Sequence, residues 1–160
     1  KGMALFPRKV NGKYVMLCRL DGFNNYIAFS DDMTAWSKAK LLQQPKYSWE
    51  LIQIGNCGSP VETEDGWLVI THGVGPMREY ALGAILLDLD NPELIIGRSK
   101  TPLIVPNAEE REGYVPNVVY SCCSMIHKED LIIPYAMSDY SSTYATVNIK
   151  ELLNELKDSK

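Results

Sequence analysis

The chain has 160 residues, of which 46% are hydrophobic and 22% charged, a balance that suits one globular domain with its own core. The net charge of −4 argues against a nucleic-acid partner, because binding a phosphate backbone requires a basic surface. No apolar run approaches the roughly 18 residues that a membrane-spanning helix needs, so no membrane partner is expected.

Short strands joined by turns are predicted along most of the chain. Two turns are typical of β-hairpins: Asn11-Gly12 precedes the first strand, and Glu64-Asp65-Gly66 precedes another. Strands are predicted at residues 13–19, 26–30, 67–72, 80–89, 117–121, 131–135 and 144–147. Only residues 150–157 have helical periodicity, so the fold class is all-β with a short C-terminal helix.

A sandwich, a barrel or a propeller could produce this series of strands. A hairpin opening that combines glycine with a following aromatic residue occurs at Gly12-Lys13-Tyr14 and again at Gly66-Trp67. A weaker copy occurs at Glu129-Asp130-Leu131, and the spacings are about 54 and 64 residues. Because long propeller blades repeat at roughly 50 residues, this recurrence favours a β-propeller.

The four cysteines form no Cys-x-x-Cys pair and have no histidine pair nearby, so no metal site is expected. Adjacent Cys122 and Cys123 would point to opposite faces of a strand. We interpret the cysteines as free thiols, either in a reducing cytoplasm or as small buried hydrophobic residues. A cytoplasmic protein without a metal or an organic cofactor is therefore expected.

A set of short motifs covers nearly the whole chain. They are Ala4-Leu5-Phe6-Pro7-Arg8, Gly12-Lys13-Tyr14-Val15-Met16-Leu17-Cys18-Arg19, Trp49-Glu50, Ile54-Gly55, Ser59-Pro60, Thr63-Glu64-Asp65-Gly66-Trp67-Leu68, His72-Gly73-Val74, Tyr80-x-x-Gly83-Ala84-x-Leu86-Leu87-Asp88, Pro102-Leu103, Glu112-Gly113-Tyr114-Val115-Pro116-Asn117-Val118-Val119 and Tyr135-x-x-x-Asp139. In this order and spacing, the set resembles glycoside hydrolase family 130.

The resemblance implies a five-bladed β-propeller about twice as long as this chain. Residues 1–160 are therefore expected to form a single domain that is the C-terminal portion of the propeller. The family's catalytic acid, an aspartate, lies upstream of the Leu5-Phe6-Pro7 motif, and no residue here matches it. No catalytic residue is expected within the chain, and an upstream segment is expected to supply it.

The implied reaction is the inverting phosphorolysis of β-mannosides, such as β-1,4-mannosyl-glucose or mannooligosaccharides. A protonated aspartic acid donates to the glycosidic oxygen, and inorganic phosphate attacks the anomeric carbon from the opposite face. The product is α-mannose 1-phosphate. The expected partners are thus a β-mannoside and phosphate, and the sequence leaves open whether the protein forms a homo-oligomer.

The resemblance implies that Arg19, His72 and Tyr80 bind the phosphate. Arg8 is a second arginine candidate for the same site. Gln53 stands where the phosphorylases usually have a phosphate-binding lysine. Since glutamine donates hydrogen bonds without a charge, this substitution leaves phosphorolysis and hydrolysis both open.

Sugar binding is implied for Asp139, which matches an aspartate that contacts a sugar hydroxyl, and for Tyr135 in the same motif. Trp36, Trp49 and Trp67 could stack on sugar rings, but at hairpin starts they are interpreted as blade-packing residues. Two alternatives to a phosphorylase remain at this point. One is a β-mannosidase of the same family, and the other is a non-catalytic carbohydrate-binding propeller fragment.

Overall fold

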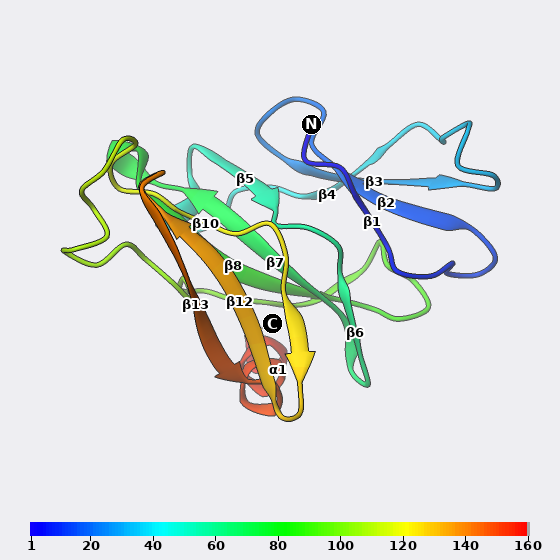
Figure 1. Ribbon diagram of the computed structural model, residues 1–160. Helices are drawn as coiled ribbons and strands as arrows, with labels where there is room; N and C mark the ends of the chain where they lie inside the picture. Colours follow the sequence, from blue (N-terminus) through cyan, green and yellow to red (C-terminus); the bar gives the residue numbers. More distant parts are fainter. Residues whose placement is uncertain (160) are drawn as a thin grey trace.

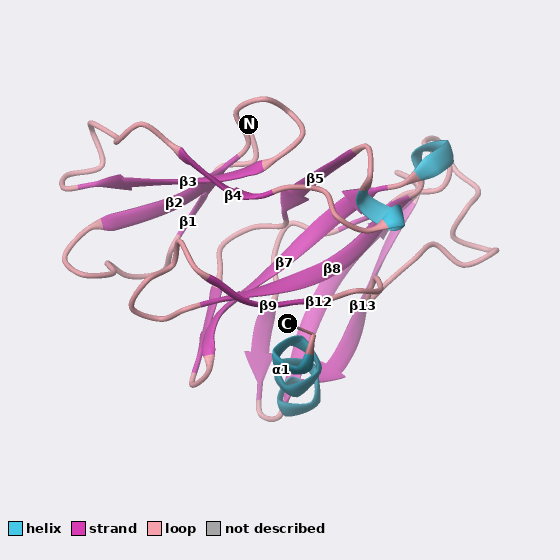
Figure 2. Cartoon of the chain, turned by 180° about the vertical axis from the view of Figure 1, so that it is seen from behind, coloured by secondary structure: helices cyan, strands magenta, loops and turns pink. Residues whose placement is uncertain are grey.

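The computed structural model describes residues 1–159 and consists of three antiparallel β-sheets and one α-helix (Figures 1 and 2). The first sheet has the order β1-β2-β3-β4. Its strands are β1 (Ala4–Leu5), β2 (Tyr14–Cys18), β3 (Asn25–Ser30) and β4 (Lys40–Gln43). Asn11 and Gly12 have φ angles of 50° and 78°, and both central residues of a type I′ hairpin turn require positive φ. The hairpin predicted from this pair is confirmed.

The second sheet has the order β5-β7-β8-β9, with β6 also paired to β7. Its strands are β5 (Gln53–Asn56), β6 (Val61–Thr63), β7 (Gly66–Val74), β8 (Tyr80–Leu87) and β9 (Ile95–Arg98). Because β5 and β6 pair with different parts of β7, they act together as one interrupted strand. Two short 3-10 turns, η1 (Ser48–Glu50) and η2 (Pro76–Arg78), adjoin this sheet.

The third sheet is built around the long strand β12, which pairs with the three other strands. Its strands are β10 (Val119–Tyr120), β11 (Met125–His127), β12 (Asp130–Met137) and β13 (Ser141–Asn148). The helix α1 (Ile149–Asp158) follows directly, and the side chain of its N-cap Asn148 accepts hydrogen bonds from the backbone N–H groups of Lys150 and Glu151. The apolar stripe of this helix is buried, as its sequence periodicity predicts.

The second sheet lies between the other two, and each of its faces covers a separate hydrophobic core (Figure 1). Toward the first sheet, Trp67, Val69, Ile85 and Leu87 pack against residues of β1, β2 and β3. Toward the third sheet and α1, the opposite face of β7 and β8 packs against aliphatic residues of those elements. This blade-like stacking confirms the prediction of an all-β partial propeller with one short C-terminal helix.

The four cysteines are free, as expected. Within residues 1–159, no helix combines the length and the hydrophobicity needed to cross a membrane.

Candidate anion site

One face of the second sheet changes from apolar to polar along its length. On this face β7 carries Leu68 and Ile70 and then His72, while Leu82 of β8 lies opposite His72. On the other side of β7, Gly55 of β5 is the direct partner of His72. Strand alternation thus places a histidine where the aliphatic core ends.

Arg19 belongs to the first sheet, directly after β2, and reaches the ring of His72. Its Nη1 lies 3.3 Å from His72 Nε2 and donates to the carbonyl oxygen of Ile54 at 3.5 Å. The Nε atom of Arg19 is buried and has no hydrogen-bond partner among the described residues. A planar cation that retains an unused donor is well suited to bind an oxyanion.

Tyr80 and Gln53 complete the group of expected phosphate ligands that the fold brings together. The ring of Tyr80 is nearly parallel to the imidazole of His72, with centroids 6.0 Å apart and an interplanar angle of 17°. Nε2 of Gln53 donates to the Tyr80 hydroxyl at 3.2 Å. Arg19 therefore contacts His72, His72 stacks on Tyr80, and Tyr80 accepts from Gln53, so the four side chains form a chain of contacts at one end of the sheet.

Two further residues contact His72, and the sequence analysis did not single them out for this site. Cys57 Sγ lies 3.6 Å from His72 Nδ1, and the centroid of the Tyr120 ring lies 5.1 Å from that of the imidazole. Cys57 could have been found from alternation, because it shares the face of Gln53 and Gly55, which precede it by four and two residues. Tyr120 has no local signal, because it comes from the third sheet. We refer to Arg19, Gln53, Cys57, His72, Tyr80 and Tyr120 as the His72 cluster.

The electrostatics of the cluster are dominated by burial. Burial first, and then the charge of Arg19, lowers the pKa of His72 from its ordinary 6.5 to about 4, so the imidazole is neutral at neutral pH. Burial raises the pKa of the Cys57 thiol to about 12, and it also raises the pKa of Tyr120. Arg19 is therefore the one formal charge within the His72 cluster. Among residues 1–159, no group of three or more His, Cys, Asp or Glu side chains is arranged to hold a metal ion.

Glycines make room for the large rings on both faces of the second sheet. A Cβ on Gly55 would lie 2.3 Å from Cε1 of His72, so the imidazole occupies the space that a side chain would need. On the other face, a Cβ on Gly73 or on Gly83 would each lie 2.5 Å from the ring of Trp49. The expectation that Trp49 packs the blades is confirmed, and the same holds for the fully buried Trp67.

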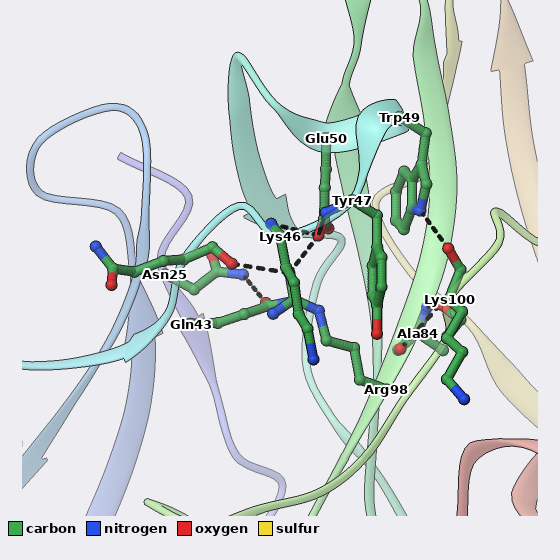
Figure 3. A network of polar contacts seen from close by, with 11 residues as sticks. Asn25, Gln43, Lys46, Tyr47, Trp49, Glu50, Ala84, Arg98 and Lys100 are labelled. Carbon is green, nitrogen blue, oxygen red and sulfur yellow. Dashed lines mark hydrogen bonds and ion pairs between the residues drawn. The ribbon is translucent and has the colours of Figure 1, made fainter. Parts of the chain in front are cut away.

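Trp49 is held in place by the polar network of η1 (Figure 3). Its Nε1 donates to the carbonyl oxygen of Lys100 at 3.1 Å. The neighbouring Glu50 is fully buried, accepts two backbone N–H groups at 2.8 and 2.9 Å, and forms an ion pair with Arg98 of β9. The turn before β5 is thereby tied to the far edge of the same sheet.

Arg8 does not join the His72 cluster. Its guanidinium lies 4.8 Å from the centroid of the Trp67 ring, and its Nε donates to Glu62 at 2.9 Å. Trp67 precedes His72 by five residues on β7, which is roughly 16 Å along an extended strand. The ion pair with Glu62 occupies this arginine at the opposite end of the sheet from His72, so the structure gives no support to its expected role in the anion site.

The residues expected to bind sugar lie on β12 and just after it. The hydroxyl of Tyr135 donates to Glu110 at 2.8 Å, and burial together with this hydrogen bond raises the pKa of Tyr135 to about 12. Asp139 is exposed in the turn before β13, with φ of 53°. A groove of about 640 Å³ on the third sheet is lined by Tyr135 and by Tyr120, the one member of the His72 cluster that lines it.

The model of glycoside hydrolase family 130, described as beta-1,4-mannooligosaccharide phosphorylase, matches residues 1–158. The chain belongs to this family. It is 40% identical over 95% of its length to a 1,2-beta-oligomannan phosphorylase of Thermoanaerobacter sp. (strain X514), covering 52% of that protein. It is also 41% identical over 87% of its length to a beta-1,2-mannobiose phosphorylase of the same organism, covering 46% of it.

Among solved structures, the beta-1,2-mannobiose phosphorylase of Listeria innocua superimposes with a TM-score of 0.90 at 31% sequence identity. The match covers 99% of this chain and 47% of the Listeria chain. The chain therefore spans about half the length of the relatives that it matches. The likeness in fold extends over all three sheets.

Proposed function

We propose that this chain forms part of an enzyme that cleaves β-mannosides with inorganic phosphate, and that the His72 cluster binds the phosphate. The observation that carries the proposal is the chain of contacts from Arg19 through His72 and Tyr80 to Gln53 at one end of a sheet, in a member of this family. The phosphorylase relatives named above support the reaction type.

Each member of the cluster has a distinct part in this proposal. Arg19 supplies the positive charge for the phosphate oxygens. The hydroxyl of Tyr80 and the amide of Gln53 are neutral hydrogen-bonding groups beside it. In this role the cluster holds the attacking anion in line with the sugar carbon, which is the positioning that a phosphorylase requires in place of a base and a water.

We further propose that the preferred linkage is β-1,2. The family model is described by a β-1,4 activity, but the two Thermoanaerobacter relatives and the Listeria structure are all named for β-1,2 substrates. Tyr135 and Asp139 remain our candidates for sugar contacts. The groove lined by Tyr120 and Tyr135 on the third sheet supports a sugar site there.

The test is an assay of the enzyme expressed from its complete gene. β-1,2-Mannobiose and β-1,4-mannobiose are each supplied with and without inorganic phosphate, and mannose 1-phosphate and free mannose are both measured. Phosphate-dependent formation of mannose 1-phosphate, faster from the β-1,2 substrate, is expected. Free mannose alone at saturating phosphate would rule out the phosphorylase and favour a hydrolase.

A Gln53→Lys variant sharpens this test, because Gln53 lies beside Tyr80 in the cluster. A charge-assisted hydrogen bond exceeds a neutral one by about 1 kcal/mol, so the Michaelis constant for phosphate should fall roughly fivefold. Gln53→Glu is the matched control, since it places a negative charge at the same position and should weaken phosphate binding. If both variants leave the phosphate dependence unchanged, the anion does not bind next to Gln53.

A further inference from the structure

The two ring nitrogens of His72 face different partners. Nε2 faces Arg19 Nη1 at 3.3 Å, and Nδ1 faces Cys57 Sγ at 3.6 Å. His72 is 3% exposed and Cys57 is 2% exposed, so bulk water does not satisfy either nitrogen. The proton on the ring must therefore match the chemistry of these two neighbours.

Arg19 determines which nitrogen carries the proton. A guanidinium group has donors and no acceptor, so Nε2 of His72 must accept from it. A neutral imidazole has a single N–H, which then lies on Nδ1 and points toward the Cys57 sulfur. In the reverse arrangement the thiol would donate to Nδ1, and the Nε2 proton would then face the donors of Arg19.

The sulfur of Cys57 is itself fixed in place. Cys57 follows β5, its backbone N–H donates to the carbonyl oxygen of Ile70 at 2.8 Å, and it packs in the hydrophobic core between the second and third sheets. The acceptor that faces Nδ1 is thus tied to the second and third sheets at once.

We propose that Cys57 is a positioning residue whose sulfur accepts the Nδ1 proton of His72 and so holds Nε2 toward Arg19. The imidazole then orients the guanidinium as a neutral acceptor. The consequence for catalysis rests on the proposed function: where phosphate binds beside Arg19, His72 contributes alignment of that arginine.

Nuclear magnetic resonance of the chain labelled with ¹⁵N-histidine tests the proposal directly. The sequence contains two histidines, and His127 on β11 is exposed, so it serves as an internal reference. At neutral pH the His72 signals are expected to show a protonated Nδ1 and an unprotonated Nε2. A protonated Nε2 would overturn the proposal.

Two variants separate a positioning role from simple packing. Cys57→Ala removes the acceptor, so the Nδ1 proton should exchange with solvent about fivefold faster. Cys57→Ser retains an acceptor of similar size, and its rate should stay within about twofold of the parent. Equal exchange rates in all three proteins would also overturn the proposal. If Cys57→Ala does not fold, the parent spectrum and the serine variant still decide the matter.

Inorganic phosphate added to the same labelled sample distinguishes this inference from the proposed function. A phosphate-dependent shift of the His72 signals supports the anion site. If phosphate leaves the His72 signals unchanged while Nδ1 stays protonated, the positioning role of Cys57 is supported. The same result would show that the isolated chain does not bind phosphate at this site.

Discussion

Gly55→Ala is the substitution whose effect follows most directly from the geometry of the site. The new Cβ would lie 2.3 Å from Cε1, 2.7 Å from Nε2 and 3.2 Å from Nδ1 of His72. The backbone of Gly55 is not among the positive-φ glycines, so an alanine brings no conformational strain of its own. The imidazole cannot rotate away freely, because it is buried between Arg19 and Cys57.

The cost has two parts. Overpacking a buried site costs roughly 1–3 kcal/mol, and displacing the ring also forfeits the hydrogen bond between Arg19 and His72, worth about 1 kcal/mol. Gly→Ala at a permitted backbone recovers about 0.4–1 kcal/mol by restricting the unfolded chain. The free energy of unfolding should therefore fall by about 1–3 kcal/mol in Gly55→Ala.

A double-mutant cycle with His72→Ala isolates this mechanism. Once the imidazole is removed, the alanine at position 55 meets no ring, so Gly55→Ala should be neutral or slightly stabilising in that background. The coupling energy between the two positions should be about 2 kcal/mol. Urea titration of the parent, the two single variants and the double variant measures it. Additive effects, with a coupling below about 0.5 kcal/mol, would show that the ring of His72 is not what Gly55 accommodates.

Two further predictions concern buried ionisable groups. Glu50→Ala leaves Arg98 largely buried without its ion-pair partner, so the free energy of unfolding measured by urea titration should fall by about 3–5 kcal/mol. Replacing both residues by apolar ones should recover most of the lost stability. The second concerns His72. Between pH 6.5 and about 4, the unfolded chain binds a proton at His72 that the folded chain excludes. Stability should therefore fall by up to about 3 kcal/mol as the pH drops through this window, and a His72→Asn variant showing the same fall would contradict this assignment.

Hairpin signals and strand periodicity were sufficient to predict the long elements. Asn11-Gly12 specifies its turn locally, since both residues adopt the positive φ that such a turn needs. The strand predicted at residues 80–89 ends at Leu87, because Asp88 accepts hydrogen bonds from the backbone N–H groups of Asp90 and Asn91 and closes a turn. The short strands β1, β4, β5, β6, β9 and β11 were not predicted, because two to four residues carry too little periodicity.

The candidate site was predictable only in part, because some of its contacts depend on strand register and on packing between sheets. The resemblance to the family predicted Arg19, His72 and Tyr80, each within a recognisable motif, and the structure brings His72 into contact with the other two. The contact between Cys57 and His72 depends on the register between β5 and β7, and the contact of Tyr120 depends on the packing of the third sheet. Arg8 shows the converse. Its motif suggested a ligand, but the neighbouring Glu62 on β6 provides a closer partner for its charge.

The alternation of glycine with large rings also explains why His72 and Gly73 are adjacent. Successive residues of β7 face opposite sides of the sheet, so the imidazole packs over Gly55 on one side while Trp49 packs over Gly73 on the other. A one-residue shift of β7 would exchange the residues on its two faces. On each face of the sheet, a large ring would then lie against a side chain and no longer against a glycine. The two rings therefore fix the register that brings His72 to Arg19, and Trp49 supports the anion site from the opposite face of the sheet.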